Sequence, residues 1–190
     1  MVMLRTPTDP RWTQCVLEDF DAFLVDHAAC ERKASATGMS FVVRYPDRPA
    51  ILDAMIEFAR EELEHFHQVY RVIASRGLQL SPDTPDPYVG ALRKCVRTGR
   101  DERLLDRLLI AAVVEARGCE RFGLVAEALP SGELREFYQE ITRSEARHHG
   151  LFVRLAREYA SPEVVTQRLS ELLDAEAELV GTLALRPALH

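Results

Sequence analysis

Hydrophobic residues recur every three or four positions along most of the chain, with polar residues between them. This period is that of an amphipathic α-helix, and no segment shows the strict alternation of a half-buried β-strand. Interruptions by Pro and Gly divide the pattern into four long helices, a short helix in the middle and a C-terminal helix. Their approximate bounds are 15–44, 49–76, 88–97, 101–129, 133–159 and 162–183.

Two short connections, YPDRP at 45–49 and PSG at 130–132, join the long helices in pairs. Helices joined by such tight turns pack antiparallel. Asp47 is the predicted N-cap of the second helix, and Asp101 that of the third long helix. The crossover at 78–88 contains three prolines and is predicted to be a loop. We therefore expect a single all-α domain over residues 1–190, a four-helix bundle with a short crossover helix and an extra C-terminal helix outside it.

A carboxylate interrupts the apolar face of each long helix near its middle. Buried carboxylates that meet in a core are costly unless they are protonated or bound to cations. Two histidines follow a glutamate by three residues, which presents an oxygen and a nitrogen on one helix face. The candidate metal ligands and catalytic residues are Glu31, Glu62, His65, Glu115, Glu145 and His148.

The spacing of these residues predicts that they lie at one level. Counted from Asp47 and Ser131, Glu31 and Glu115 both lie 16 residues before their turn (47 − 31; 131 − 115). The two Glu-x-x-His motifs begin 15 and 14 residues after the turn (62 − 47; 145 − 131). One Glu from each of two helices, with Glu-x-x-His from the other two, is the ligand set of di-iron and di-manganese carboxylate bundles of the ferritin-like type.

Two rival assignments were weighed. Glu64 and His67 also form Glu-x-x-His, but they share a face with charged residues, so we reject that register. Glu120 competes with Glu115, because Cys-Glu-Arg occurs at both 30–32 and 119–121. Glu120 lies only 11 residues before the turn (131 − 120), so Glu115 is the preferred ligand.

Other residues carry less information. His27, one turn before Glu31, is either a partner of that carboxylate or a core histidine. The net charge of −6 argues against non-specific coating of nucleic acid. No apolar run approaches the ~20 residues of a membrane span, and no secretory signal is evident, so we expect a cytoplasmic protein. Four cysteines without a CxxC pair are expected to be reduced thiols: Cys15, Cys30, Cys95 and Cys119.

From about residue 17 to 159 the chain resembles the tRNA 2-methylthio-isopentenyl-adenosine hydroxylases, the MiaE family. The resemblance is carried by DHAACERKASATGMSFVVRYPDRP, AREELEHFHQV, ALRKCVRTGRDERLLDRLLIAAVVEARGCERF and FYQEITRSEARHHGLFVRLAREY. It implies a ferritin-like, non-haem di-iron monooxygenase that hydroxylates the isopentenyl group of the hypermodified adenosine beside the tRNA anticodon. The family's iron ligands fall on the six residues named above.

The resemblance also implies partners: two iron ions, O2, electrons from an external reductase, and the tRNA anticodon stem-loop as substrate. Between Ala91 and Arg107, six basic residues face three acidic ones. This segment is the predicted phosphate contact, through Arg93, Lys94, Arg97, Arg100 and Arg103. The alternative is that these side chains merely solvate a short helix. Whether the protein is a monomer or a dimer is not predicted.

Two other functions stay open at this stage. A ferritin-like or rubrerythrin-like iron oxidase or peroxidase would use the same ligands, because four carboxylates and two imidazoles suit iron or manganese whatever the substrate. A metal-free helical interaction module would bind no ion.

Overall fold

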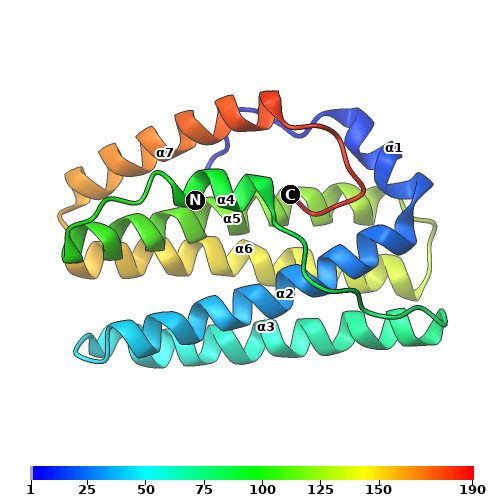
Figure 1. Cartoon of the computed structure of the whole chain (residues 1–190), viewed down its shortest axis with the longest axis horizontal. Helices are drawn as coiled ribbons and strands as arrows, with labels where there is room; N and C mark the ends of the chain where they lie inside the picture. The colour runs from blue at the N-terminus through cyan, green and yellow to red at the C-terminus, as the bar shows by residue number, and fades with distance from the viewer. Residues whose placement is uncertain (1) are drawn as a thin grey trace. The chain divides into compact units, whose positions relative to one another are not determined.

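The computed structural model describes residues 2–190, and within them every regular element is an α-helix (Figure 1). The helices are α1 (Pro10–Glu18), α2 (Phe20–Arg44), α3 (Pro49–Ser75), α4 (Pro87–Arg93), α5 (Arg100–Ala128), α6 (Glu133–Tyr159) and α7 (Pro162–Thr182). The all-α prediction is confirmed.

The chain divides into two compact units, each built on one long helical hairpin. The α2–α3 unit comprises Gln14–Thr84 and Arg186–Leu189. The α5–α6 unit comprises the N-terminal residues as far as Thr13, together with Pro85–Leu185 and His190. Each unit is described by itself below, and the single domain over 1–190 stays a prediction.

Close backbone contact characterises the α2–α3 unit. Gly38 faces α3 so closely that a Cβ there would lie 2.9 Å from Cδ1 of Phe58 and 3.1 Å from the Met55 carbonyl oxygen. One turn earlier, the Ser35 hydroxyl donates to the Ala59 carbonyl at 2.7 Å. The two helices therefore touch at a small residue, one to two turns from Glu31.

The α5–α6 unit is larger, because α4 and α7 pack on its hairpin. Phe122 of α5 packs against Tyr138 of α6, with ring centroids 5.9 Å apart. Arg168 of α7 donates to Asp106 of α5 and to the Cys95 carbonyl. The C-terminal helix is thus attached to the crossover segment as well as to α5.

Two glycines end or begin helices with backbone conformations that disfavour other residues. Gly77 has φ +72°, and the amides of Gly77 and Leu78 donate back to the carbonyls of Ala74 and Ile73. This is the Schellman arrangement that closes a helix C-terminus. Gly132 has φ +150° at the N-cap of α6.

Several predicted helix boundaries were wrong. The first helix is two helices, because the chain breaks at Asp19, whose side chain caps α2 by accepting from the Ala22 amide. The N-cap of α3 is Arg48 instead of Asp47, and that of α5 is Gly99 instead of Asp101. The short helix ends at Arg93 and not near Arg97.

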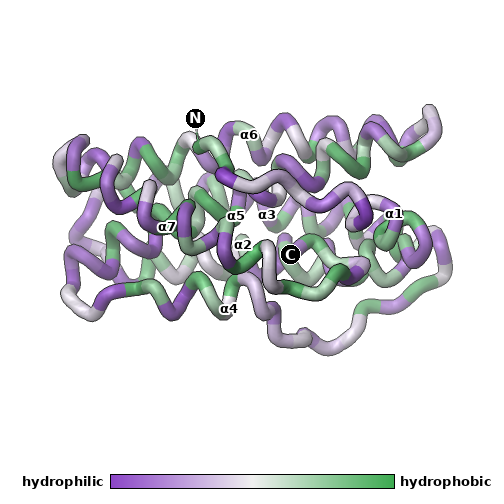
Figure 2. Tube along the Cα trace, turned by 90° about the horizontal axis from the view of Figure 1, so that it is seen from above, coloured by the Kyte–Doolittle hydropathy of each residue, from purple (hydrophilic) through white to green (hydrophobic). Residues whose placement is uncertain are grey.

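No helix among residues 2–190 is both long and apolar enough to cross a lipid bilayer. Figure 2 shows hydrophobic and hydrophilic residues interspersed along the long helices. This interspersion reflects helices with one face in a core and the other in solvent.

Candidate metal centre

In the α2–α3 unit, Glu31, Glu62 and His65 meet with one ligand atom each within 4.8 Å of the others. His65 Nδ1 lies 3.7 Å from a Glu31 oxygen and 3.6 Å from a Glu62 oxygen. All three side chains are buried, Glu62 to 1% exposure. The helical spacing of three residues between Glu62 and His65 places both donors on the face of α3 that meets α2.

The electrostatics of this cluster are those of an ion pair. Burial raises the pKa of Glu31, but hydrogen bonds from His27 and His65 outweigh it and leave the pKa below its usual value. Burial lowers the pKa of His65, whereas Glu31 and Glu62 raise it further, to about 10. His65 therefore carries a proton at neutral pH in the metal-free protein, and a bound cation would take the place of that proton.

A fourth buried group, His27, completes this side of the centre. Its Nε2 lies 2.7 Å from Glu31 Oε1, and its side chain has no exposed surface. Of the two interpretations of His27 given above, the structure supports a partner of Glu31.

In the α5–α6 unit, Glu115, Glu145 and His148 also have one ligand atom each within 4.8 Å of the others. His148 Nδ1 lies 3.3 Å from a Glu145 oxygen. Glu145 and His148 are each 2% exposed, and Glu115 is half-buried. Each hairpin therefore presents two carboxylates and one imidazole at one place.

This donor set fits iron or manganese. Carboxylate oxygens and imidazole nitrogens are the ligands of non-haem iron, and no thiol lies in either group of three. Two buried carboxylates against one imidazole leave an excess of negative charge in each hairpin, which a divalent cation would neutralise. The residues present thus suit the group that the sequence predicts.

The structure places both rival glutamates away from these groups. Glu120 accepts hydrogen bonds from the Thr8 amide and hydroxyl and from Arg117. Glu64 and His67 lie on an exposed face, with side chains 58% and 49% exposed. The choice of Glu115 over Glu120 agrees with this geometry, although the six-ligand assignment itself stays a prediction.

The basic segment before α5 is only partly available for binding. Arg97 is held by the buried Asp106, which accepts from its backbone amide at 2.8 Å and its guanidinium at 2.8 and 2.9 Å. Arg103 donates to the Thr98 carbonyl. Arg93 and Lys94 are exposed. The Arg97 side chain therefore stabilises the loop in which it lies.

Two buried polar groups were not predicted from the sequence. In the first, Arg117 donates to Glu176 at 2.8 Å, and Tyr88 donates to the same carboxylate at 2.9 Å. All three side chains are fully buried. They lie 29 residues or more apart in sequence (117 − 88; 176 − 117), so no short motif could have signalled them.

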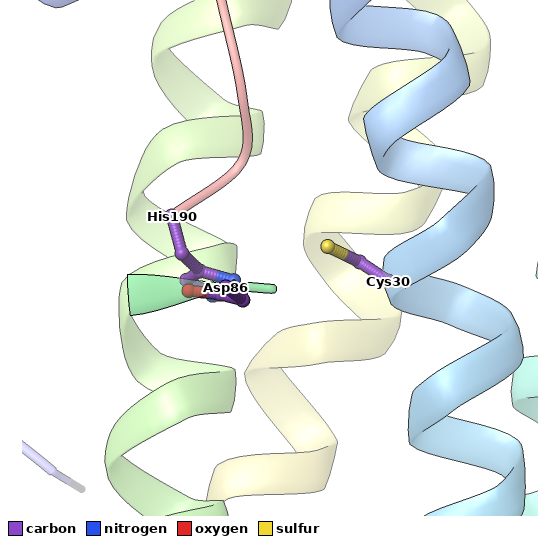
Figure 3. A group of neighbouring side chains, drawn as sticks. All are labelled: Cys30, Asp86 and His190. Carbon is purple, nitrogen blue, oxygen red and sulfur yellow. Dashed lines mark ion pairs between the residues drawn. The ribbon is translucent and has the colours of Figure 1, made fainter. Parts of the chain in front are cut away.

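In the second group, His190 stacks on Tyr88 with ring centroids 5.0 Å apart, and its Nδ1 lies 3.5 Å from Asp86 (Figure 3). Asp86 is also the N-cap of α4, where it accepts from two backbone amides. Burial raises the pKa of Asp86, but the contact with His190 and the amides lower it to about 2. This group fixes the start of the crossover helix.

Comparison with known proteins points to one family. The model of the tRNA-(ms2io6A)-hydroxylase family, MiaE, matches residues 1–190. A Pseudomonas putida protein named tRNA 2-(methylsulfanyl)-N(6)-isopentenyladenosine(37) hydroxylase is 36% identical over 177 residues, which cover 93% of this chain and 86% of that protein. A Salmonella typhimurium protein of the same name is 36% identical over 130 residues, 68% of this chain and 47% of that protein.

A solved structure from Synechococcus, titled as a protein with aldehyde deformylating oxygenase activity, is 38% identical and superposes with a TM-score of 0.92. The superposition covers 97% of this chain and 92% of that one. This neighbour has the ferritin-like helical fold, so the predicted fold class is confirmed. With the family model matched along its whole length, the chain belongs to the MiaE family of tRNA hydroxylases.

Proposed function

We propose that this protein binds two iron ions through Glu31, Glu62, His65, Glu115, Glu145 and His148 and hydroxylates the isopentenyl group of the modified adenosine beside the tRNA anticodon. The observation that carries the proposal is that each hairpin holds two carboxylates and one imidazole within 4.8 Å. The equal distances of these groups from their turns support their union in one centre.

The reaction requires an external reductant. Insertion of one oxygen atom of O2 into a C–H bond, with the second leaving as water, consumes two electrons and two protons. No side chain in either group of three is a redox donor, so a reductase or a chemical substitute supplies the electrons. Bound iron would supply the oxygen activation that side chains lack.

The protein's own residues prepare the centre. Glu31 and Glu62 hold His65 between them, which fixes the imidazole and keeps its Nδ1 directed at both carboxylates. On α6, Glu145 directs His148 in the same way. Burial of both groups keeps bulk water away, so that an oxidant formed there meets the substrate before it meets solvent.

For the tRNA, we assign the phosphate contacts to the exposed Arg93 and Lys94 and to Arg100 and Arg103 at the start of α5. Phosphate contacts contribute affinity that falls steeply with salt concentration. Lys94→Glu is expected to weaken binding of an anticodon stem-loop and to reduce the slope of its salt dependence. Arg71→Glu, an equal charge change at an exposed site on α3, is the matched control. Equal effects of the two variants would remove this assignment.

A second candidate activity comes from the Synechococcus relative, whose title gives aldehyde deformylating oxygenase activity. Its identity of 38% is no lower than that of the tRNA hydroxylases, so the same centre in this chain is a candidate for aldehyde substrates. A long-chain aldehyde therefore belongs in the assay as a separate substrate.

The deciding experiment uses iron-loaded protein, a chemical reductant and tRNA that carries the 2-methylthio-isopentenyl group, under labelled O2. Mass analysis of the digested nucleosides is expected to show one added labelled oxygen atom, only when O2 and reductant are both present. Hydrocarbon from the aldehyde with unchanged tRNA would favour the second candidate. Consumption of O2 without either product would favour an iron oxidase or peroxidase. Because tRNA is the substrate, we place the reaction in the cytoplasm.

A further inference from the structure

The contact between His27 and Glu31 divides the work of a single carboxylate. His27 lies one turn before Glu31 on α2, with its side chain wholly buried. Its Nε2 is 2.7 Å from Glu31 Oε1. The other oxygen, Oε2, lies 3.7 Å from His65 Nδ1, among the candidate ligands. One oxygen of Glu31 thus faces the histidine, and the other faces the centre.

The direction of this hydrogen bond follows from the chemistry of its partners. An ionised carboxylate has only acceptor atoms, so Nε2 of His27 must carry the hydrogen and donate it. A charge-assisted bond of this length is among the stronger hydrogen bonds in proteins. A metal ion that took Oε1 as a ligand would compete directly with it. The bond therefore favours the use of Oε2 alone.

The other hairpin has no equivalent on its helix. The residue four positions before Glu115 is Ala111, whose methyl group offers no hydrogen. The two carboxylates that the first helix of each hairpin contributes therefore differ in their surroundings, although the residues themselves are the same.

We propose that His27 is a positioning residue that restricts Glu31 to coordination through one oxygen. The inference rests on the proposed di-iron centre and adds a rule for its asymmetry. Because one carboxylate oxygen is withheld, the iron bound by the α2–α3 hairpin keeps one more coordination position open to a small molecule.

Two variants of His27 isolate this role. His27→Gln places an amide donor near the position of Nε2, whereas His27→Asn carries the same amide one methylene short of Glu31. The ligand-field bands of the diferrous protein in near-infrared circular dichroism distinguish five-coordinate from six-coordinate iron. We expect His27→Gln to keep the wild-type bands. His27→Asn should show a shift to higher coordination and iron binding weaker by ~10–100-fold, as for other partners of metal ligands.

The wild-type protein alone gives a second test, which does not depend on how the variants fold. The infrared difference spectrum of ferrous binding should contain a widely split pair of carboxylate stretches, which one-oxygen coordination produces, and Glu31→Gln should remove it. Bands that are identical in His27→Asn and wild type, or absence of the split pair, would overturn the role of His27. Failure of the wild-type protein to bind iron would instead overturn the proposed function.

Discussion

In the α2–α3 hairpin the mid-helix carboxylate of the first helix is held by a buried histidine, whereas in the α5–α6 hairpin the same position relative to Glu115 is occupied by Ala111. The remaining donors match, since Glu62 and His65 have their counterparts in Glu145 and His148. Similar ligands thus do not imply similar metal positions. The difference between the halves resides in the residues that touch the ligands.

The two hairpins are also stabilised differently. Arg117 and Glu176 form a fully buried ion pair in the α5–α6 unit. In the α2–α3 unit, the pairs Arg32–Asp83 and Arg76–Asp21 lie on the surface, and the helices instead approach closely at Gly38. One hairpin depends on buried charge and the other on the absence of a side chain.

The largest expected effect comes from removal of one Glu-x-x-His histidine from either hairpin. His65→Ala and His148→Ala should each weaken iron binding by more than ~100-fold, because loss of a direct ligand exceeds loss of its partner. Both should abolish hydroxylation of tRNA. Iron content by mass spectrometry and nucleoside analysis measure the two outcomes.

His67→Ala is the matched control, since His67 follows Glu64 at the same spacing on the exposed face of α3. It should retain iron and activity. If His148→Ala kept full iron content while His65→Ala lost it, the α5–α6 hairpin would not contribute ligands and the proposed symmetry would fail.

The helices and the candidate ligands were predictable because both depend on local spacing. Apolar positions with a period near 3.6 mark a buried face, and Glu62 with His65 on that face is visible in the sequence alone. The helix caps were not predictable, because Asp19 and Asp47 are equally good capping residues by type and only Asp19 caps a helix. Long-range pairs such as Arg117 with Glu176 carry no local signal.

Breaking the buried pair should have the next largest effect, confined to stability. Glu176→Gln leaves the buried Arg117 without its carboxylate, and loss of one partner of such a pair costs ~3–5 kcal/mol. Asp174→Ala on the same helix removes an exposed pair with Arg5 and should cost less than ~1 kcal/mol. Urea unfolding of both variants measures the difference. Equal losses would show that the buried pair contributes no more than the surface pair.

Cys119 tests the charge of the α5–α6 ligand group. Burial and the carboxylates of Glu145 and Glu115 raise the pKa of this thiol to about 11. Because only the thiolate reacts, alkylation of the metal-free protein at pH 8 should be ~100-fold slower than for a thiol with a pKa of 9. The rate should rise about tenfold per pH unit until pH approaches 11.

Metal binding should sharpen this result, since a cation that neutralises the two carboxylates lowers the pKa of Cys119 and accelerates its alkylation. Mass mapping of the modified peptide measures the rate with and without ferrous ion. A rate that metal leaves unchanged would mean that the charge of Glu115 and Glu145 is not altered by binding.

The smallest expected effects come from glycine substitutions that differ in sign between the hairpins. Gly38→Ala would bring a Cβ to 2.9 Å from Phe58 and 3.1 Å from backbone of α3, and such overpacking costs ~1–3 kcal/mol. Gly118→Ala on α5 meets nothing nearer than Phe122 at 3.9 Å, so the gain of ~0.5–1 kcal/mol from replacing a helical glycine should appear. Thermal unfolding midpoints that fall for Gly38→Ala and rise for Gly118→Ala would establish that close helix contact, absent at Gly118, is what the α2–α3 hairpin requires. A rise in both would mean that α3 moves to accommodate the methyl group, and the contrast between the hairpins would then rest on buried charge alone.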